Sequence, residues 1–508
     1  MTWSPETSNG FESDKIRFEV LPYLARGGID VGCGPKKVWP HLIGLDNGAD
    51  TALFGVPMKP DMVISSADRL GIFADNAVDN VYSSHLLEHI ADWHAALREW
   101  WRVLKPGGYL CLYLPHADLY PNIGQPGSNP DHKHDFRPED ILDFVALAFP
   151  HWTLHEHQVR GEGNEYSFLL VLQKHADGGQ RVAVKPQGKT AGLVRVGAKG
   201  DAVWASSPCA LLKEQGYHVT AYVARTGAEI LAADPNIDRL VELPDGALED
   251  DELLEFWARE AAKHDKWINL IGSVEQRLLF HPSSNEFFLP QSLRHRFGNV
   301  NYLEMIHDYA GLPHDFRQKY YPTAAETEWA ETVRAKLPPG PLVVLNPCGS
   351  GPAKTWPHAQ RFLELMAAAK INVVVLGDLR LPLEEINENT AIVGTEWPVR
   401  AALAFAQLAD VVVATESLIA NAVAFEPMLK IVMLSHSSNE NLTKHWINTA
   451  AVEPQVACHP CHRIHGAHLG FCSKDTVTGA AACMASAPAE TIAEVVMNEV
   501  AWCQQVAA

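Results

Sequence analysis

The chain has 508 residues, more than one hydrophobic core usually holds, so about two to four domains are expected. Its 41 Lys and Arg residues and 61 Asp and Glu residues give a formal net charge of −20. A surface of this charge repels nucleic acid backbones and anionic lipid, so we expect no nucleic acid partner. No apolar run is long enough to span a bilayer, and residues 1–15 lack the apolar core of a signal peptide. We therefore expect a cytoplasmic protein without a transmembrane segment.

The first third of the chain has the pattern of a nucleotide-binding α/β sheet. A short strand ends in the glycine turn Gly28-Ile-Asp-Val-Gly-Cys-Gly-Pro-Lys36, and the next strand, Ile43-Gly-Leu-Asp46, ends in an acid. Glycines allow the backbone to approach a ligand, and an acid at the end of the second strand can bind ribose hydroxyls. Two further strands are expected at 78–84 and 109–114. Between them lie His85-Leu-Leu-Glu-His89 and a helix expected at 93–104.

This series of motifs resembles the class I S-adenosylmethionine-dependent methyltransferases over nearly all of residues 1–178. The resemblance implies that S-adenosylmethionine is the cofactor and that it is bound by Asp30, Gly32, Gly34, Asp46, Asp68 and His85. By the same resemblance the two glycines face the methionine part, Asp46 binds the ribose hydroxyls and Asp68 binds the adenine amino group. His85 would lie near the position of methyl transfer. The alternative is a degenerate domain that has kept the fold and lost the chemistry; Pro35, where many relatives have a third glycine, is a mild departure.

The segment Asn129-Pro-Asp-His-Lys-His-Asp-Phe136 is dense in titratable groups. His132 or His134 could serve as a base near neutral pH, on a loop that contacts the methyl acceptor. Two histidines and two aspartates also suggest a metal site. A solvated loop before the next helix is the alternative.

A second α/β pattern follows a polar, glycine-rich linker at 179–190. An apolar strand near Gly192 leads into the loop Val196-Gly-Ala-Lys-Gly-Asp201, then into a helix that ends at Gly216 and a strand at 218–223. Asp201 is expected beyond the carboxyl end of the strand, where open α/β sheets place their chemistry. Taken alone, Asp201 could equally be an ordinary helix cap.

A third α/β pattern begins with Leu342-Val-Val-Leu-Asn-Pro-Cys-Gly-Ser-Gly351, a strand and a glycine loop. Lys354 follows this loop, and Thr415-Glu-Ser417 follows a later strand and opens a helix. Free N–H groups at helix amino termini can bind anions, so two such termini and Lys354 could hold a diphosphate. Singly, Lys354 could be a surface cation and Thr415 a helix cap; together with Asp201, they favour a ligand site between two domains.

Residues 191 to about 500 resemble the heptosyltransferase-like (family 9) glycosyltransferases of the GT-B fold. The resemblance rests on the Gly200-Asp201 pair, on Pro208 within the following helix, and on Lys354 before Trp356-Pro357. It implies that Asp201 is the base that activates an acceptor hydroxyl. It also implies that an ADP-heptose-like nucleotide sugar is bound by Lys354, Thr415, Glu416, Ser417 and Asn421. Glu416, Ser417 and Asn421 depart from the Asp-Thr-Gly and His pattern of the family.

Four of the nine cysteines follow the pattern C-x2-C-x10-C-x10-C at Cys458, Cys461, Cys472 and Cys483. Two thiolates separated by two residues can bind one tetrahedral ion, and soft thiolates accept iron or zinc equally well. Nearby histidines are competing ligands: His459, His462, His465 and His468. The cluster resembles the cysteine finger of the bacterial autotransporter heptosyltransferases, which bind iron through four cysteines. The alternatives are one structural iron or zinc ion and four free buried cysteines.

The sequence therefore predicts an α/β protein with three Rossmann-like domains. The expected boundaries are 1–178 for the methyltransferase domain, 191–338 for the acceptor domain, and 339–508 for the donor domain with its metal finger at 458–483. The predicted function is transfer of a sugar to a hydroxyl of a protein or glycan, with an attached methyltransferase. A non-catalytic scaffold, or a surface-glycan tailoring enzyme whose main reaction is methylation, is the alternative, and homo-oligomerisation is left open.

Overall fold

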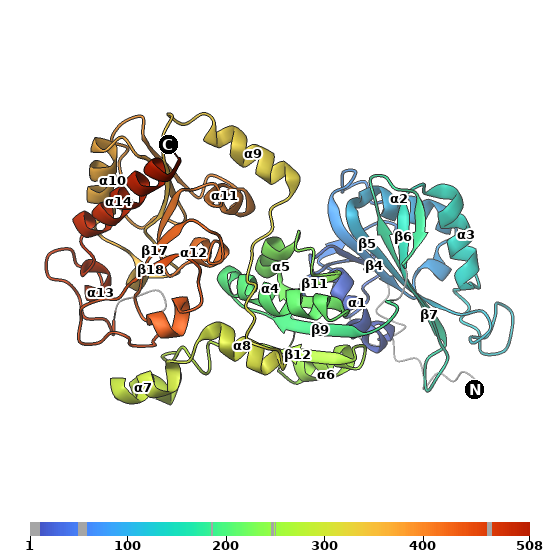
Figure 1. Ribbon diagram of the computed structural model, residues 1–508. Coiled ribbons are helices and arrows are strands. Elements are labelled where there is room, and N and C mark those ends of the chain that lie inside the picture. Colours follow the sequence, from blue (N-terminus) through green and yellow to red (C-terminus); the bar gives the residue numbers. More distant parts are fainter. Residues whose placement is uncertain are drawn as a thin grey trace. The chain divides into compact units, whose positions relative to one another are not determined.

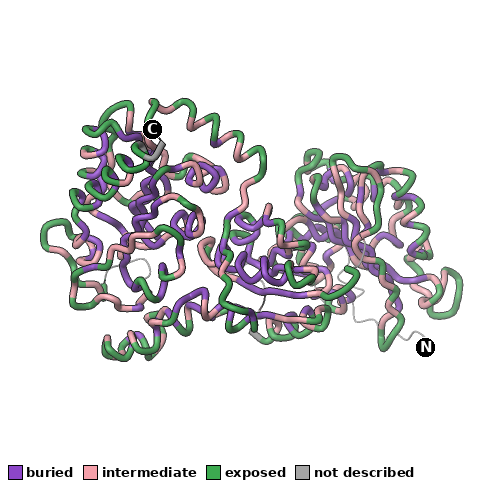
Figure 2. Tube along the Cα trace, viewed as in Figure 1, coloured by how far each residue is buried: buried purple, intermediate pink, exposed green. Residues whose placement is uncertain are grey.

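The computed structural model describes residues 11–48, 58–183, 186–244, 248, 250–464 and 470–507. They fold into two compact units. The first unit comprises Met1–Pro186 and Glu242–Arg259, and the second comprises Gln187–Val241 and Glu260–Ala508. Figure 1 labels the elements, and Figure 2 shows that the buried residues of each unit concentrate along its strands.

The first unit is built on an eight-stranded sheet with the order β3-β2-β1-β4-β5-β7-β6-β8. Its central strands are parallel, whereas β7 runs antiparallel to β5 and β6. The strands are β1 (Ile29–Val31), β2 (Ile43–Asp46), β3 (Met62–Val63), β4 (Val78–Ser84), β5 (Leu104–Pro115), β6 (Trp152–Arg160), β7 (Ser167–Lys174) and β8 (Gln180–Val182). The helices are η1 (Glu12–Lys15), α1 (Arg17–Leu24), η2 (Leu87–His89), α2 (Trp93–Val103) and α3 (Pro138–Ala148).

Helix α2 shows how local sequence fixes an element of this unit. Asp92 caps it by accepting a hydrogen bond from the Ala95 N–H at 3.0 Å, which satisfies a donor that the first turn leaves free. Leu97 and Trp100 recur at helical spacing on one face and are fully buried. The Trp100 Nε1–H donates to the Ala67 carbonyl at 2.8 Å, so the buried indole keeps its hydrogen bond.

Two details differ from the domain boundaries expected from the sequence. Strand β8 lies inside the expected linker 179–190 and pairs with β6 in parallel register, Trp152 opposite Gln180. All three residues of β8 are exposed, so this edge strand has no apolar alternation by which the sequence could signal it. In addition, residues 242–259, expected within 191–338, belong to the first unit, and the division passes through β11 (Arg239–Leu243) and α6 (Asp250–Ala261).

The second unit contains a four-stranded sheet with the order β11-β10-β9-β12. Strand β9 (Thr190–Arg195) pairs in parallel with β10 (His218–Ala224) and β12 (Lys266–Asn269). Helix α4 (Lys199–Glu214) connects β9 to β10 and is buried continuously from Ala202 to Leu212. The other helices of this part are α5 (Arg225–Leu231), η3 (Asn285–Phe288), α7 (Gln291–Gly298) and α8 (Tyr302–Ala310).

The second unit also contains a fully parallel six-stranded sheet with the order β15-β14-β13-β16-β17-β18. Every residue of the four central strands is buried, as expected when helices cover both faces. The strands are β13 (Leu342–Asn346), β14 (Asn372–Leu376), β15 (Thr390–Gly394), β16 (Val411–Thr415), β17 (Leu429–Met433) and β18 (Thr449–Val452). The helices are α9 (Ala324–Arg334), η4 (Pro352–Lys354), α10 (Ala359–Ala368), α11 (Val399–Ala406), α12 (Leu418–Ala422), the π-helix η5 (Asn439–Thr443), α13 (Ala482–Ala485) and α14 (Ala489–Ala507).

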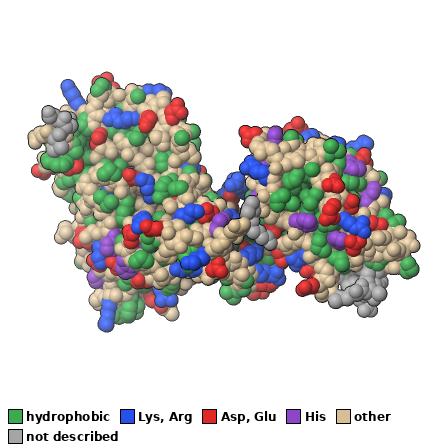
Figure 3. Space-filling view, turned by 45° about the vertical axis from the view of Figure 1, so that its right-hand side comes forward, with side chains coloured by type: hydrophobic (Ala, Val, Ile, Leu, Met, Phe, Trp, Pro, Cys, Tyr) green, Lys and Arg blue, Asp and Glu red, His purple; other side chains and the backbone are tan. Residues whose placement is uncertain are grey.

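Three α/β sheets with parallel central strands confirm the predicted fold class. Within the described ranges, no helix combines the length and the apolar character that crossing a bilayer requires. On the face drawn in Figure 3, Lys and Arg side chains are interspersed with Asp and Glu.

Candidate active sites

The first candidate site begins at the glycine turn that follows β1. Gly32 and Gly34 have φ angles of 75° and 58°, in the left-handed region that favours glycine. A Cβ on Gly32 would lie 2.7 Å from the Leu86 side chain, so the close approach of these two segments requires glycine. The Gly34 N–H donates to Asp46 Oδ2 at 2.9 Å. The structure thus brings both predicted glycines and Asp46 together at the carboxyl edge of the sheet.

The other predicted cofactor residues occupy different environments. Asp30 lies within β1, where its Oδ2 accepts a hydrogen bond from the Val38 N–H at 2.8 Å. Burial raises the pKa of Asp30 to about 7. Its side chain contacts the backbone of the loop that follows β1. Asp68 lies in the loop after β3, the strand next to β2, and accepts a hydrogen bond from Ser66 Oγ at 2.5 Å.

His85 directly follows β4. Strand β4 pairs in parallel with β1, with Val31 opposite Ser83, so His85 lies at the same edge of the sheet as the glycine turn. Its φ is 48°, and its Nε2 lies 2.9 Å from Ser167 Oγ. Burial lowers the pKa of His85 well below its usual value, so the imidazole is neutral at physiological pH. A neutral ring on this edge is consistent with the predicted place beside the methyl-transfer position.

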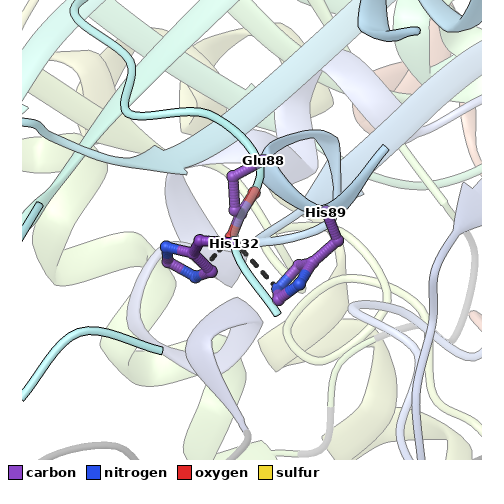
Figure 4. A group of neighbouring side chains, drawn as sticks. All are labelled: Glu88, His89 and His132. Atoms are coloured by element: carbon purple, nitrogen blue, oxygen red, sulfur yellow. Dashed lines mark ion pairs between the residues drawn. The ribbon is translucent and has the colours of Figure 1, made fainter. Parts of the chain in front are cut away.

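Sequence reasoning missed the most unusual residue of this edge, Glu88. Its side chain is fully buried, and neither carboxylate oxygen accepts a hydrogen bond from another described residue. His89 Nε2 and His132 Nε2 lie 3.8 Å and 3.9 Å from Glu88 Oε1, and Figure 4 shows the two rings converging on the carboxylate. The pattern H-x-x-E-H in His85-Leu-Leu-Glu-His89 was the available signal, but only the fold brings His132 to it.

The second candidate site is a cavity of about 940 Å³ in the second unit, lined by residues of α4 and of the segment after β12, and by residues at and beyond the strand ends of the six-stranded sheet. Five predicted residues line it: Asp201, Lys354, Glu416, Ser417 and Asn421. Thr415, predicted with them, instead lies at the end of β16 with its side chain fully buried. Helix α10, the helix that follows Lys354 in the chain, begins at Ala359.

Asp201 is held in the first turn of α4 by two kinds of contact. Its Oδ2 accepts a hydrogen bond from the Ala198 N–H at 3.1 Å, the capping role considered above. The same oxygen lies 2.9 Å from Arg195 Nη2, and this buried guanidinium also pairs with Glu275 Oε1 at 2.8 Å. Asp201 therefore both caps the helix and faces the cavity. Arg195 and Glu275, 80 residues apart, were not predicted.

The two carboxylates beside Arg195 differ in acidity. Burial and the negative charge of Glu275 raise the pKa of Asp201 to about 6, against the opposing charge of Arg195. Burial would also raise the pKa of Glu275, but the Arg195 guanidinium outweighs it and lowers that pKa. Asp201 is thus the more basic of the pair, ionised at neutral pH and able to accept a proton.

Lys354 lies on the other side of the cavity, beside a buried acid. Its Nζ is 3.5 Å from Glu416 Oε2. Glu416 accepts hydrogen bonds from the N–H groups of Ser435 and Ser437 at 2.7 Å and 3.0 Å, and His436 Nε2 lies 3.0 Å away. Burial would raise the pKa of Glu416, but the charges of His436 and Lys354 and these hydrogen bonds hold it below its usual value. Glu416 thus anchors the lysine rather than facing an anionic ligand unpaired.

Asn421 joins the two halves of the second unit. Its Oδ1 accepts a hydrogen bond from Trp204 Nε1–H at 3.3 Å, and its carbonyl accepts one from Gln318 Nε2 at 2.5 Å. A Cβ on Gly200 would lie 2.9 Å from Asn421 Nδ2, so glycine allows α4 and α12 to approach. Ser417 caps α12 by accepting a hydrogen bond from the Ala420 N–H at 3.4 Å.

The four cysteines predicted to bind metal lie close enough to influence one another. Burial, with the neighbouring groups of Cys461, Cys472 and Cys458, raises the pKa of Cys483 to about 12. Four neighbouring thiols are a soft donor set, and a bound cation would stabilise them as thiolates, so the residue types fit the predicted ion. Among the described residues, however, their sulfurs are not gathered within 4.8 Å of one another. His465 and His468 lie outside the described residues, and His462 Nε2 lies 3.3 Å from His295 Nδ1.

Comparison with known proteins bears on the first unit most directly. Residues 29–112 match the family described as Methyltransferase domain. An uncharacterized methyltransferase from Schizosaccharomyces pombe is 34% identical over 112 residues, which are 18% of this chain and 40% of that protein. The chain thus spans less than half the length of this curated relative. The prediction that the first unit carries a methyltransferase domain is confirmed.

Solved structures resemble the two units separately. The glycosyl transferase family 9 protein of Veillonella parvula is 11% identical, with 63% of this chain and 99% of that chain covered and a TM-score of 0.44. The ADP-heptose lps heptosyltransferase II of E. coli is 13% identical, with 62% and 99% covered and a TM-score of 0.42. A SAM-dependent methyltransferase of Thermotoga maritima is 17% identical, with 33% and 99% covered and a TM-score of 0.23. At these identities the likeness concerns the fold alone.

The arrangement of the first site predicts that Asp46→Ala weakens binding of S-adenosylhomocysteine about tenfold to a hundredfold, because it removes the charged acceptor predicted for the ribose hydroxyls. Isothermal titration calorimetry on the full-length protein measures the affinity. Asp79→Ala is the matched control, since Asp79 pairs with Lys105 on the surface of the same unit. Absence of binding to the wild type at about millimolar ligand would contradict the predicted cofactor site.

Proposed function

We propose that this protein is a two-enzyme fusion. Its second unit would transfer a sugar from a nucleoside diphosphate donor to a hydroxyl acceptor, and its first unit would be an S-adenosylmethionine-dependent methyltransferase. The observation that carries the sugar transfer is the joint presence of Asp201, on α4, and Lys354, on the loop after β13, in one cavity. A scaffold that only binds partners has no need of a basic carboxylate and a facing cation in the same cavity.

The proposed reaction assigns one task to each side of the cavity. Asp201 removes the proton of the acceptor hydroxyl while the oxygen forms a bond to the anomeric carbon of the sugar. The bond from that carbon to the diphosphate oxygen breaks, and its electron pair stays on the diphosphate. The ammonium group of Lys354 stabilises this growing negative charge.

The position of Lys354 supports its assignment. Glu416 holds the ammonium group by charge, yet the carboxylate already receives two backbone N–H donors and His436. Its charge is therefore shared, which leaves the lysine able to bind an anion as well. The sequence resemblance of residues 191 to about 500 makes ADP-heptose the first donor to test, with a protein or glycan as acceptor.

We further propose domain limits of 1–178, 191–338 and 339–508 for the methyltransferase, acceptor and donor parts, with residues 242–259 packed within the first unit. We also propose that Cys458, Cys461, Cys472 and Cys483 hold one structural iron or zinc ion in the donor part. Four protein ligands would leave such an ion without an open position, so its contribution would be to stability.

Asp201→Asn is expected to lower sugar transfer about a hundredfold or more, because the amide cannot accept the acceptor proton. The amide oxygen can still accept the Ala198 N–H, so the helix cap and donor affinity should persist. Lys354→Ala is expected to weaken both donor binding and turnover, because it removes charge from the donor side. Donor affinity and transfer rate are measured separately, with the exposed Asp308→Asn as control. If Asp201→Asn transfers sugar at the wild-type rate, Asp201 serves only as a helix cap.

The rate of sugar transfer is expected to fall as the pH falls through about 6, because Asp201 becomes protonated there and a base must be ionised to act. Glu275→Gln should move this fall to lower pH, since the negative charge of Glu275 raises the pKa of Asp201. Transfer rates measured from about pH 4.5 to about pH 8, on both sides of the Asp201 pKa, test both statements. If Glu275→Gln does not change the pH dependence of the transfer rate, Asp201 is not the group whose titration causes the fall.

Protein purified without chelator is expected to hold about one thiolate-bound iron or zinc ion per chain. Cys461→Ser should lose that ion and unfold the donor part at a lower temperature. Elemental analysis gives the metal content, and exchange with Co²⁺ identifies thiolate ligands by a sulfur-to-metal absorption band. A wild type without that band would contradict the proposed finger. The exposed Cys503→Ser is the control.

A further inference from the structure

We propose that Glu88, His89 and His132 form a binding site for a divalent transition-metal ion at the carboxyl edge of the first sheet. One carboxylate oxygen and two imidazole nitrogens lie within 4.8 Å of one another. Among the described residues, no other group of three His, Cys, Asp or Glu side chains brings its ligand atoms this close together. Figure 4 shows that the side chains point toward one another from two separate segments.

The first argument is the unsatisfied carboxylate. Glu88 is fully buried, and its two oxygens accept no hydrogen bond from another described residue. The nitrogens of His89 and His132 are 3.8 Å and 3.9 Å from Glu88 Oε1, beyond hydrogen-bonding distance. A buried charge without a partner is costly, and buried charges are normally paired or bound to a metal. A cation between the three side chains would supply the missing partner.

The second argument is the spacing. Two ligand atoms bound at about 2.1 Å to one tetrahedral ion lie about 3.4 Å apart. The separations of 3.8 Å and 3.9 Å therefore need to shorten by about half an ångström, which small side-chain rotations provide. Two imidazoles and one carboxylate suit zinc, iron(II) and related ions rather than calcium or magnesium, which prefer oxygen ligands.

The third argument is that the backbone fixes the two segments to each other. The Glu88 carbonyl accepts hydrogen bonds from the N–H groups of Lys133 and His134 at 2.8 Å and 3.2 Å. Lys133 Nζ donates to the His89 carbonyl at 2.8 Å. The loop that carries His132 is therefore held beside η2 by contacts to backbone carbonyls, which leave the three ligand side chains free of them. The site would be preorganised, as tight metal binding requires.

Three protein ligands leave at least one position for a water molecule or an acceptor oxygen, as in catalytic metal sites. The site is next to His85, whose Nδ1 lies 3.8 Å from Glu88 Oε1, and close to the glycine turn through Leu86. An acceptor hydroxyl bound there would lose its proton more readily. This catalytic role rests on the methyltransferase function proposed above, whereas the metal binding itself does not.

The test uses full-length protein freed of metal by a chelator and titrated with Zn²⁺ or Co²⁺. Glu88→Gln and His132→Gln should each bind one ion fewer than the wild type and keep the sulfur-to-cobalt band of the cysteine site. His94→Gln is the control, because His94 is an exposed histidine of the same unit that stacks on Trp93. Binding of S-adenosylhomocysteine by each variant shows that the first unit is folded.

Equal metal content in the wild type and in both folded variants would overturn the proposal. His132→Gln keeps the test decisive if Glu88→Gln does not fold, since His132 lies on a loop held by other contacts. Loss of the metal without any change in sugar transfer would leave the proposed function of the second unit intact. Absence of the sulfur-to-cobalt band in every protein would count against the cysteine finger alone.

Discussion

The central strands of all three sheets run parallel, and their backbone hydrogen bonds place the carboxyl ends of neighbouring strands at one edge. In the first sheet the register Val31 to Ser83 sets the glycine turn beside His85. In the four-stranded sheet, Val194 opposite Asn269 allows Arg195 to reach Glu275 in the loop after β12. In the six-stranded sheet, Asn346 opposite Ala414 sets the Lys354 loop beside Glu416. The candidate chemistry of every part therefore follows from strand direction.

Two buried glutamates show how hydrogen bonding decides the state of a charge. Glu416 receives two backbone N–H donors, a serine hydroxyl and His436, and its pKa is held below its usual value. Glu88 receives no donor from another described residue, and burial raises its pKa to about 8. The first carboxylate is completed by the chain itself, whereas the second needs a proton or a cation from outside.

The cavity of the second unit depends on contacts that join its two sheets. Trp204 on α4 donates to Asn421 on α12, and Gly200 permits that approach. Arg195 then places Asp201 on the α4 side, and Glu416 places Lys354 on the other. The carboxylate of Asp201 and the ammonium group of Lys354 thus face the same cavity, and each is positioned by a different buried residue. In the proposed sugar transfer, this separation is why acceptor activation and stabilisation of the leaving group are expected to respond to different substitutions.

The sequence by itself determined what is local: the three α/β patterns, the glycine turns at Gly32 and Gly34, and Asp201 and Lys354 beyond their strands. These features depend on apolar runs and on conformations that only glycine adopts easily, which neighbouring residues encode. The tertiary structure decided which loops meet. Glu275 joins Arg195 across 80 residues, His132 joins Glu88 across 44, and Thr415 turns into the core. No local pattern specifies such partners, because strand order and register, rather than sequence distance, decide which loops share an edge.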